Sequence, residues 1–250
     1  MMNPSKLNAP YMHAETVTIV LLPGLDGTGA LFAPFVEALG PGCEAIVVAY
    51  PAELALDYAA LEQFARARLP VGRPYFLLGE SFSGPIAIAL AAALPDGLVG
   101  LVLSCTFARN PHPYLAPFKS VIGLLPVKSE AAGAMLMPLL FGRHGSVEAH
   151  SALRQSLKRV AAATLRRRVR SVLEVDTTAR FAGLHLPMLY LQASRDRIVF
   201  ARSGAQLARL APAMTVVSLD GPHMLLQALP AEAAREVGQF MRRVLHDAGR

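Results

Sequence analysis

The chain has 250 residues, of which 53% are hydrophobic and 17% are charged. This length suits one domain with a single large core, and the composition excludes a generally disordered chain. The formal net charge of +6 is concentrated between Arg143 and Arg209, where 13 Lys or Arg stand against 4 Asp or Glu, but no nucleic-acid recognition motif accompanies it.

The first 15 residues are polar and interrupted by Pro4 and Pro10, which does not predict a signal peptide. No uncharged apolar stretch reaches the roughly 18 residues that a membrane span needs, so we expect a cytoplasmic protein. Cys43 and Cys105 show no metal or redox spacing, and we expect both to be small buried thiols in or beside strands. No metal or other cofactor is implied.

Strands and helices alternate over the first hundred residues. Apolar, β-branched runs predict strands at 16–22, 45–49, 75–78 and 99–104, and the intervening segments predict helices at 30–39, 57–69 and 84–94. The first run is apolar on both faces, which is typical of a strand in a parallel sheet covered on both sides. The alternation predicts an α/β fold with a doubly wound, mostly parallel sheet.

The alternation stops between 109 and 181. Prolines and glycines punctuate the first part of this segment, whereas residues 147–175 have a helical pattern and carry most of the arginines. Strands are predicted again at 188–192 and 215–219, with helices at 203–210 and 231–245. We therefore expect a core formed by 1–108 and 182–250, with 109–181 as a helical insertion after the strand at 99–104.

The segment 79–84, Gly-Glu-Ser-Phe-Ser-Gly, places Ser81 in a G-x-S-x-G motif between a buried strand and an apolar helix. Small residues are common, so the motif alone is weak, and the strand-turn-helix context gives it weight. A plain structural turn is the alternative. In the catalytic interpretation, the glycines let strand and helix cross closely while Ser81 lies on a strained, exposed turn.

A serine nucleophile needs a base and a carboxylate that orients the base, in the chain order Ser, Asp or Glu, His. Asp196 follows the strand at 188–192 and His223 follows the strand at 215–219, so both would lie at the carboxyl edge of the sheet. Asp176 and Asp220 are the rival acids. We predict Ser81 as nucleophile, Asp196 as acid and His223 as base.

An oxyanion needs two backbone N–H donors. Phe82, directly after the nucleophile, should supply one. The other should come from the Gly-rich turn at 23–29, where Leu25 is the first choice and Asp26 the second. A phosphate loop is the alternative, but the turn lacks the Lys and the spacing of a P-loop.

Taken together, the segments at 22–24, 79–84, 194–199 and 221–223 resemble the ordered motifs of the α/β-hydrolase superfamily. The chain resembles small bacterial esterases such as the pimeloyl-carrier-protein methyl ester esterases, and its turn at 23–29 also resembles the plant phytyl-ester and acylglycerol acyltransferase-like hydrolases. The turn departs from many members by lacking their His-Gly. The resemblance implies the α/β-hydrolase fold, with 109–181 as a helical lid.

These features predict a serine hydrolase that cleaves a carboxylic ester or thioester through an acyl-enzyme intermediate. Acyl transfer on the same scaffold and a non-catalytic binding protein are the alternatives, the latter disfavoured by the intact Ser, Asp and His. The fold does not specify the substrate. Candidate pocket residues are Phe32, Leu115, Phe118 and Met135, for each of which ordinary core packing is the simpler explanation.

Arginines of the predicted lid indicate one further partner. On a helix, Arg154 and Lys158 share a face, as do Arg166 and Arg170. Arginine suits carboxylate and phosphate recognition, so a substrate carried by an acidic protein is one hypothesis. A solvated helix face is the simpler interpretation.

Overall fold

The computed structural model describes residues 16–118 and 129–248, in which six strands form one sheet. The strand order is β2-β1-β3-β4-β5-β6, and all five neighbouring pairs are parallel. The strands are β1 (Val17–Leu22), β2 (Cys43–Val47), β3 (Tyr75–Glu80), β4 (Leu98–Ser104), β5 (Met188–Ala193) and β6 (Thr215–Leu219). The prediction of a doubly wound parallel sheet is confirmed.

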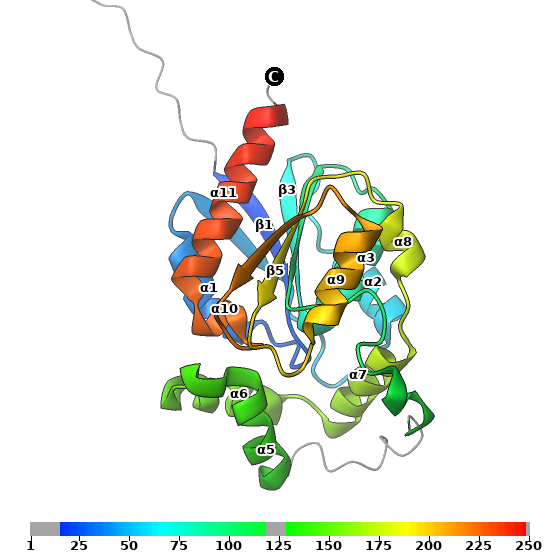
Figure 1. Ribbon diagram of the computed structural model, residues 1–250, viewed down its shortest axis with the longest axis vertical. Helices are drawn as coiled ribbons and strands as arrows, with labels where there is room; N and C mark the ends of the chain where they lie inside the picture. Colours follow the sequence, from blue (N-terminus) through cyan, green and yellow to red (C-terminus); the bar gives the residue numbers. More distant parts are fainter. Residues whose placement is uncertain (1–15, 119–128, 249–250) are drawn as a thin grey trace, which may run out of the picture.

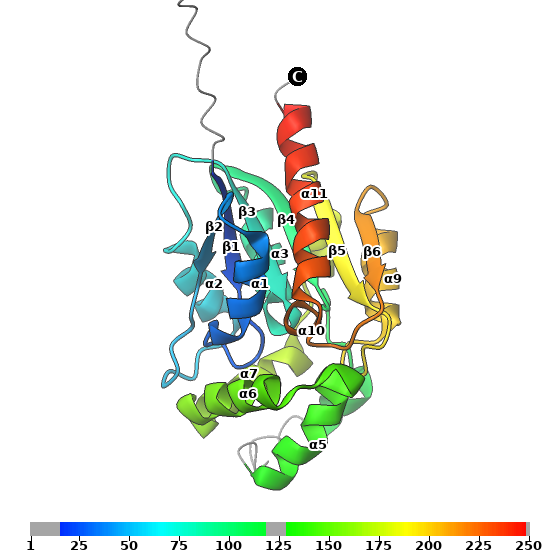
Figure 2. The same cartoon turned by 90° about the vertical axis from the view of Figure 1, so that its left-hand side faces the viewer.

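Helices cover both faces of this sheet (Figures 1 and 2). One face carries α1 (Ala33–Leu39), α10 (Leu225–Ala228) and α11 (Pro230–Ala248); the other carries α2 (Tyr58–Arg66), α3 (Gly84–Ala92), α8 (Thr178–Ala182) and α9 (Ala201–Leu210). Successive side chains of a strand point to opposite faces. Ile19 and Leu21 accordingly join one core cluster, and Val20 and Leu22 the other. Burial on both faces explains the uninterrupted apolar run.

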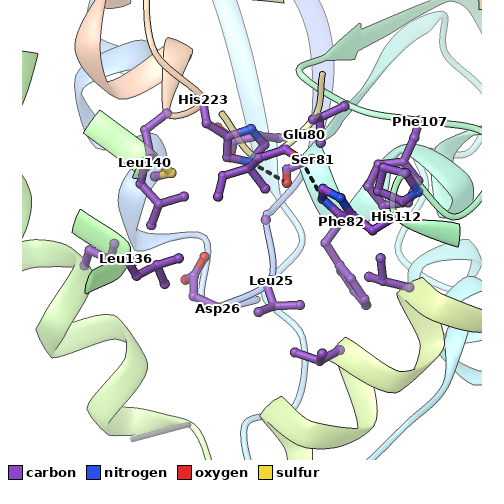
Figure 3. Close-up of a pocket in the computed structure, with 18 of the residues that line it drawn as sticks. Leu25, Asp26, Glu80, Ser81, Phe82, Phe107, His112, Leu136, Leu140 and His223 are labelled. Carbon is purple, nitrogen blue, oxygen red and sulfur yellow. Dashed lines mark hydrogen bonds between the residues drawn. The ribbon is translucent and has the colours of Figure 1, made fainter. Parts of the chain in front are cut away.

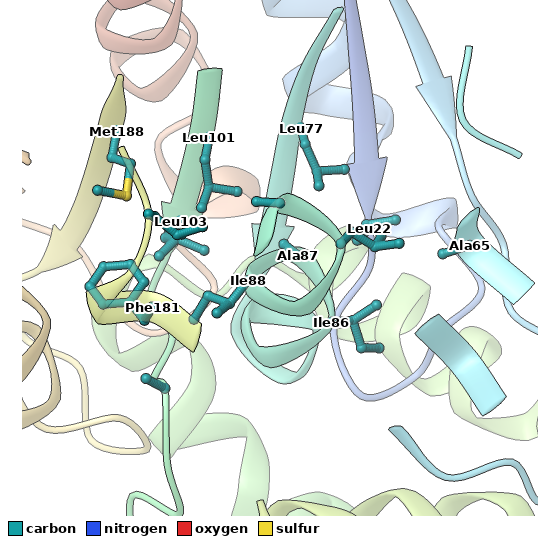
Figure 4. Packing of buried hydrophobic residues seen from close by; sticks show 14 of the residues in the cluster. Leu22, Ala65, Leu77, Ile86, Ala87, Ile88, Leu101, Leu103, Phe181 and Met188 are labelled. Carbon is teal, nitrogen blue, oxygen red and sulfur yellow. The ribbon is translucent and has the colours of Figure 1, made fainter. Parts of the chain in front are cut away.

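Helix α3 lies at the centre of the larger cluster (Figure 4). All residues from Gly84 to Ala91 are buried, because the helix is covered by β3 and β4 on one side and by α2 and α8 on others. A helix enclosed in this way is apolar all round. The core thus fixes the position of α3, whose first residue follows the G-x-S segment.

Between β4 and β5 the described chain contains α5 (Glu130–Phe141), α6 (Val147–Arg159) and α7 (Ala162–Glu174), which we refer to together as the helical insertion. These helices lie beyond one end of the sheet (Figures 1 and 2). The two ends of the insertion are joined by backbone hydrogen bonds, from Asn110 N–H to the Val175 carbonyl at 3.0 Å and from Thr177 N–H to the Ala108 carbonyl at 2.7 Å.

Helix α8 overlaps the end of the segment 109–181 that is predicted to form a lid. Phe181, on α8, is fully buried in the larger core cluster, which also contains Met188 (Figure 4). Helix α8 therefore packs with the sheet, although the assignment of a separate lid unit stays a prediction. Cys105 is buried and Cys43 is half-buried. Within the described ranges, none of the helices has the length and apolar character that crossing a bilayer requires.

Candidate active site

The site forms where the strand order reverses direction. From β1 the chain passes to β2 on one side, and the next strand, β3, pairs with the other side of β1. The segments that follow β1 and β3 therefore diverge and leave a crevice at the carboxyl edge, where open α/β sheets bind ligands. Leu22 and Gly79 lie side by side, so the Gly-rich turn (residues 23–29) adjoins Ser81.

Ser81 begins a short 3₁₀ turn between β3 and α3, and its φ of 48° lies in the left-handed region. A non-glycine residue there is strained by about 1–3 kcal/mol. At the two glycines that flank the Ser81 turn, β3 and α3 are too close for a side chain. A Cβ on Gly79 would lie 2.7 Å from the Ala87 Cβ, and a Cβ on Gly84 would overlap Thr106. The core thus holds Ser81 in its unfavourable conformation and directs its hydroxyl into the crevice.

A continuous hydrogen-bonded chain runs from Ser81 through His223 to Asp196 (Figure 3 shows the first bond). Ser81 Oγ lies 2.8 Å from His223 Nε2, and His223 Nδ1 lies 2.7 Å from Asp196 Oδ2. The second carboxylate oxygen of Asp196 accepts from Ile198 N–H at 2.8 Å and Val199 N–H at 2.7 Å. In this arrangement an imidazole can take the proton of a serine hydroxyl.

The rival acids have other partners. Exposed Asp220 accepts hydrogen bonds from Arg195, Arg143 and Ser194 and so stabilises the turn before His223. Asp176 accepts from the N–H and hydroxyl of Thr178 at the start of α8. The structure therefore brings Ser81, Asp196 and His223 together and leaves the other two carboxylates outside the chain of hydrogen bonds.

The Gly-rich turn contributes free backbone donors. Gly27 N–H donates to the Gly24 carbonyl at 3.0 Å, and Gly27 and Gly29 have φ of 69° and 72°. Within the described chain, the N–H groups of Leu25 and Asp26 donate to no protein acceptor, and both residues border the cavity. These are properties that oxyanion donors require.

A cavity of about 490 Å³ adjoins Ser81, between the sheet edge and the helical insertion (Figure 3). Most of its wall is aliphatic, and no Lys or Arg of the described chain borders it. The apolar residues that line it are Leu25, Leu31, Leu115, Leu136, Leu140, Leu153, Leu157, Val169, Val172, Leu173, Ile198, Val199 and Met224, together with Phe82, Phe107 and Pro111.

Of the predicted pocket residues, Leu115 borders this cavity, whereas Phe32 and Met135 do not. Phe32 packs in the core cluster beneath α1 and α11, and Met135 is 72% exposed. Their neighbours in sequence, Leu31 and Leu136, line the cavity instead. The side chain of Phe118 lies outside the described residues. The two corrections have one cause, since adjacent residues of a helix point in different directions.

Two further titratable groups border the cavity. Burial raises the pKa of the Glu80 carboxyl to about 7, against the lowering effect of a hydrogen bond from Gln227. Burial also lowers the pKa of His112, whose Nε2 lies 2.8 Å from the Ile198 carbonyl. No sequence pattern around His112 indicates that it lines the cavity.

A model of the family described as serine aminopeptidase, S33, matches residues 45–227. The pimeloyl-[acyl-carrier protein] methyl ester esterase of Xanthomonas axonopodis pv. citri is 27% identical over 233 residues, which cover 84% of this chain and 90% of the relative. The chloroplastic phytyl ester synthase 1 of Arabidopsis thaliana is 28% identical over 121 residues, but these cover 43% of this chain and only 17% of the plant enzyme.

The fold also matches solved structures. A thermophilic esterase from Thermogutta terrifontis is 20% identical to this chain and superposes on it with a TM-score of 0.79. The superposition covers 91% of this chain and 90% of the esterase chain. The family match extends from β2 past His223 and includes both Ser81 and Asp196. The chain therefore belongs to the serine aminopeptidase S33 family of α/β hydrolases.

Proposed function

We propose that this α/β hydrolase is a serine esterase or thioesterase that works through an acyl-enzyme. The observation that carries the proposal is the buried Ser81–His223–Asp196 chain, with links of 2.8 Å and 2.7 Å, at the floor of an apolar cavity. The acid and base side chains are nearly fully buried, 3% and 4% exposed respectively. Low solvent exposure strengthens the interactions among such groups.

In the first half-reaction, His223 Nε2 takes the hydroxyl proton as Ser81 Oγ attacks the ester carbonyl carbon. The carbonyl π electrons move to oxygen, and the resulting oxyanion accepts hydrogen bonds from Phe82 N–H and Leu25 N–H. The imidazolium then gives its proton to the departing alkoxide or thiolate. Water, deprotonated by His223, attacks the acyl-serine and releases the acid and the free Ser81 hydroxyl.

The cavity favours a neutral, apolar acyl group. Its wall presents aliphatic side chains to the substrate, and among the described residues the ionisable groups that border it, apart from the histidines, are the carboxyls of Asp26 and Glu80. An anionic acyl chain would lose its hydration there without gaining a lysine or arginine partner from the described part of the wall. Two of the relatives are a methyl ester esterase and a phytyl ester synthase, which supports an acyl substrate.

Acyl transfer is the second candidate, because the same acyl-enzyme serves hydrolysis and transfer and differs only in the nucleophile that removes the acyl group. The helical insertion covers the cavity, and burial of the acyl-enzyme beneath it would limit the access of water. The partial match to a plant ester synthase favours keeping this candidate.

The insertion also presents the cations that an acidic carrier protein would contact. Arg154, Lys158 and Arg159 lie on α6 and are exposed. Of the two helices that carry the predicted Arg-Lys and Arg-Arg pairs, we place the proposed carrier contact at α6, where three exposed cations lie within six residues. A relative named for its action on a carrier-linked pimeloyl methyl ester supports it.

Replacement of Ser81 by Ala should lower kcat for a nitrophenyl ester by about 10⁶-fold while the melting temperature stays close to that of the wild type. A fluorophosphonate probe should label Ser81, as determined by peptide mass spectrometry. Ser83, whose hydroxyl is hydrogen-bonded to Tyr50 and to the Pro23 carbonyl, is the matched control for labelling. Labelling at Ser83, or turnover by the Ser81 variant, would contradict the assignment.

Asp196→Asn should lower kcat by up to about 10⁴-fold, because the amide can hold His223 in the wrong tautomer. Asp220→Asn and Asp176→Asn should change kcat much less, since each removes only local turn contacts. Steady-state kinetics on the three variants ranks the carboxylates. A larger loss at Asp176 or Asp220 than at Asp196 would show that the acid is elsewhere.

With nitrophenyl esters of increasing acyl length, kcat/KM should rise about fourfold per methylene until the cavity is filled, following about 0.8 kcal/mol for each buried CH₂. A hemisuccinate ester should be a poor substrate compared with the butyrate of similar size, because Asp26 and Glu80 border the cavity. A preference for the anionic ester would rule out the apolar acyl assignment.

If α6 docks an acidic carrier, KM for an acyl thioester of such a carrier should rise steeply with salt, since exposed charges are screened over about 10 Å at 0.1 M. KM for a nitrophenyl butyrate should barely change. Reversal of Arg154 and Lys158 to Glu should impair only the carrier substrate. Reversal of Arg242 and Arg243, at the opposite end of the molecule on α11, is the control. Equal effects of both double variants would contradict docking at α6.

A further inference from the structure

Arg168, on α7 of the helical insertion, is the largest fully buried side chain and is only 1% exposed. Its guanidinium donates to three backbone carbonyls: Leu25 at 3.0 Å, Asp26 at 2.7 Å and Pro51 at 3.1 Å. Two of these acceptors belong to the Gly-rich turn beside Ser81. Arg168 therefore joins the insertion to the turn that borders the candidate nucleophile.

A buried cation of this kind is costly for the fold. Its burial lowers the pKa of the guanidinium, and in the described chain it forms no direct ion pair with a carboxylate. The neighbouring arginines of α7 behave differently, since Arg167 and Arg170 reach carboxylates at the surface. The planar guanidinium presents its N–H donors in a fixed fork from two terminal nitrogens, whereas the three donors of a lysine ammonium all leave from a single nitrogen.

Gly27 leaves the space that Arg168 occupies. A Cβ on Gly27 would overlap the guanidinium, and the φ of 69° at this position also disfavours a side chain. The turn is therefore shaped around the arginine as well as around its own hydrogen bonds.

A second helix of the insertion contacts the same turn. Ser156, on α6, donates to Asp26 Oδ2 at 3.1 Å and lies 2.5 Å from Thr28 Oγ1. The carboxylate of Asp26 in turn accepts from the N–H and the hydroxyl of Thr28. Both α6 and α7 thus hold the turn from the side of the insertion.

These contacts fix the peptide planes on either side of Leu25. In a trans peptide the carbonyl and the following N–H point in opposite directions. The Gly24 carbonyl is held by Gly27 N–H, so Leu25 N–H points away from the interior of the turn. Arg168 holds the next plane through the Leu25 carbonyl. Rotation of Leu25 would break one of these bonds.

We propose that Arg168 is a positioning residue that preorganises the oxyanion hole by tying helix α7 to the Gly-rich turn. The hole is then competent only while the helical insertion is docked on the turn, so the insertion acts on the chemical step as well as covering the substrate. This inference rests on the proposed serine hydrolase function, with Leu25 N–H as one oxyanion donor.

The test compares Arg168→Met and Arg168→Lys with Arg167→Met, a substitution of the adjacent surface arginine. For a neutral nitrophenyl ester, kcat per active site titrated by the acylation burst should fall about 10²-fold in Arg168→Met, the effect of a displacement of about 1 Å, with KM changed less than about threefold. Arg168→Lys should retain part of the activity, and Arg167→Met should retain all of it.

A trifluoromethyl ketone with the same acyl chain gives a readout that loss of stability alone does not change. Addition of Ser81 Oγ to its carbonyl, with the proton passing to His223, forms a tetrahedral adduct whose oxyanion occupies the hole. Its inhibition constant should therefore rise across the variants in proportion to the fall in kcat. A decrease in kcat with unchanged inhibitor affinity, or an unchanged kcat in Arg168→Met, would overturn the proposal.

If the Arg168 variants do not fold, Ser156→Ala provides the test, because it removes one hydroxyl from the same turn. It should lower kcat and inhibitor affinity together by about fivefold, the equivalent of one hydrogen bond. No change in either would overturn the proposal. Ser81→Ala separates the two hypotheses: an active Ser81 variant refutes the proposed function, whereas an inactive one with fully active Arg168 or Ser156 variants refutes this inference alone.

Discussion

The candidate active site depends on how closely helix α3 approaches strand β3. At the crossing, the strand and the helix approach so closely that a Cβ would not fit at Gly79 or Gly84. Ser81, between these two glycines, takes a left-handed backbone conformation. The enclosing core, in which α3 is buried on all sides, offsets this strain. Loosening of that core would let Ser81 relax away from His223. The geometry of the site therefore depends on the packing of the larger cluster.

The other parts of the site follow from the parallel arrangement of the sheet. Because all six strands run in one direction, the segments after β1, β3, β5 and β6 emerge at the same edge. These segments place the Gly-rich turn, Ser81, Asp196 and His223 at that edge, although the four are far apart in sequence. Each loop is then fixed by backbone hydrogen bonds, such as those from Ile198 and Val199 to the Asp196 carboxylate. The sheet sets positions and the loops set orientations.

The sequence allowed the sheet and the hydrogen-bonded Ser-Asp-His chain to be predicted, because both leave local signals. Apolar runs identify buried strands, and the position of Asp196 and His223 directly after strands places them at one edge. The cavity wall was predicted less well. Leu31 and Leu136 line it in place of Phe32 and Met135, since composition does not tell which of two adjacent apolar residues faces a cavity. The burial of Arg168 could not be predicted, because it lies in a run of arginines whose charge is the same whether a member is buried or exposed.

The ends of the helical insertion meet at 108–110 and 175–177, where backbone hydrogen bonds join them. A segment whose ends are already adjacent adds little loop-closure entropy when its length changes, since that cost grows only slowly with length. Evolution can therefore lengthen, shorten or exchange the intervening helices without altering the sheet, and so change the wall of the cavity while the hydrogen-bonded chain of Ser81, His223 and Asp196 stays in place. The residues that restrain this freedom are Arg168 and Ser156, because any replacement segment must again supply groups that hold the Gly-rich turn.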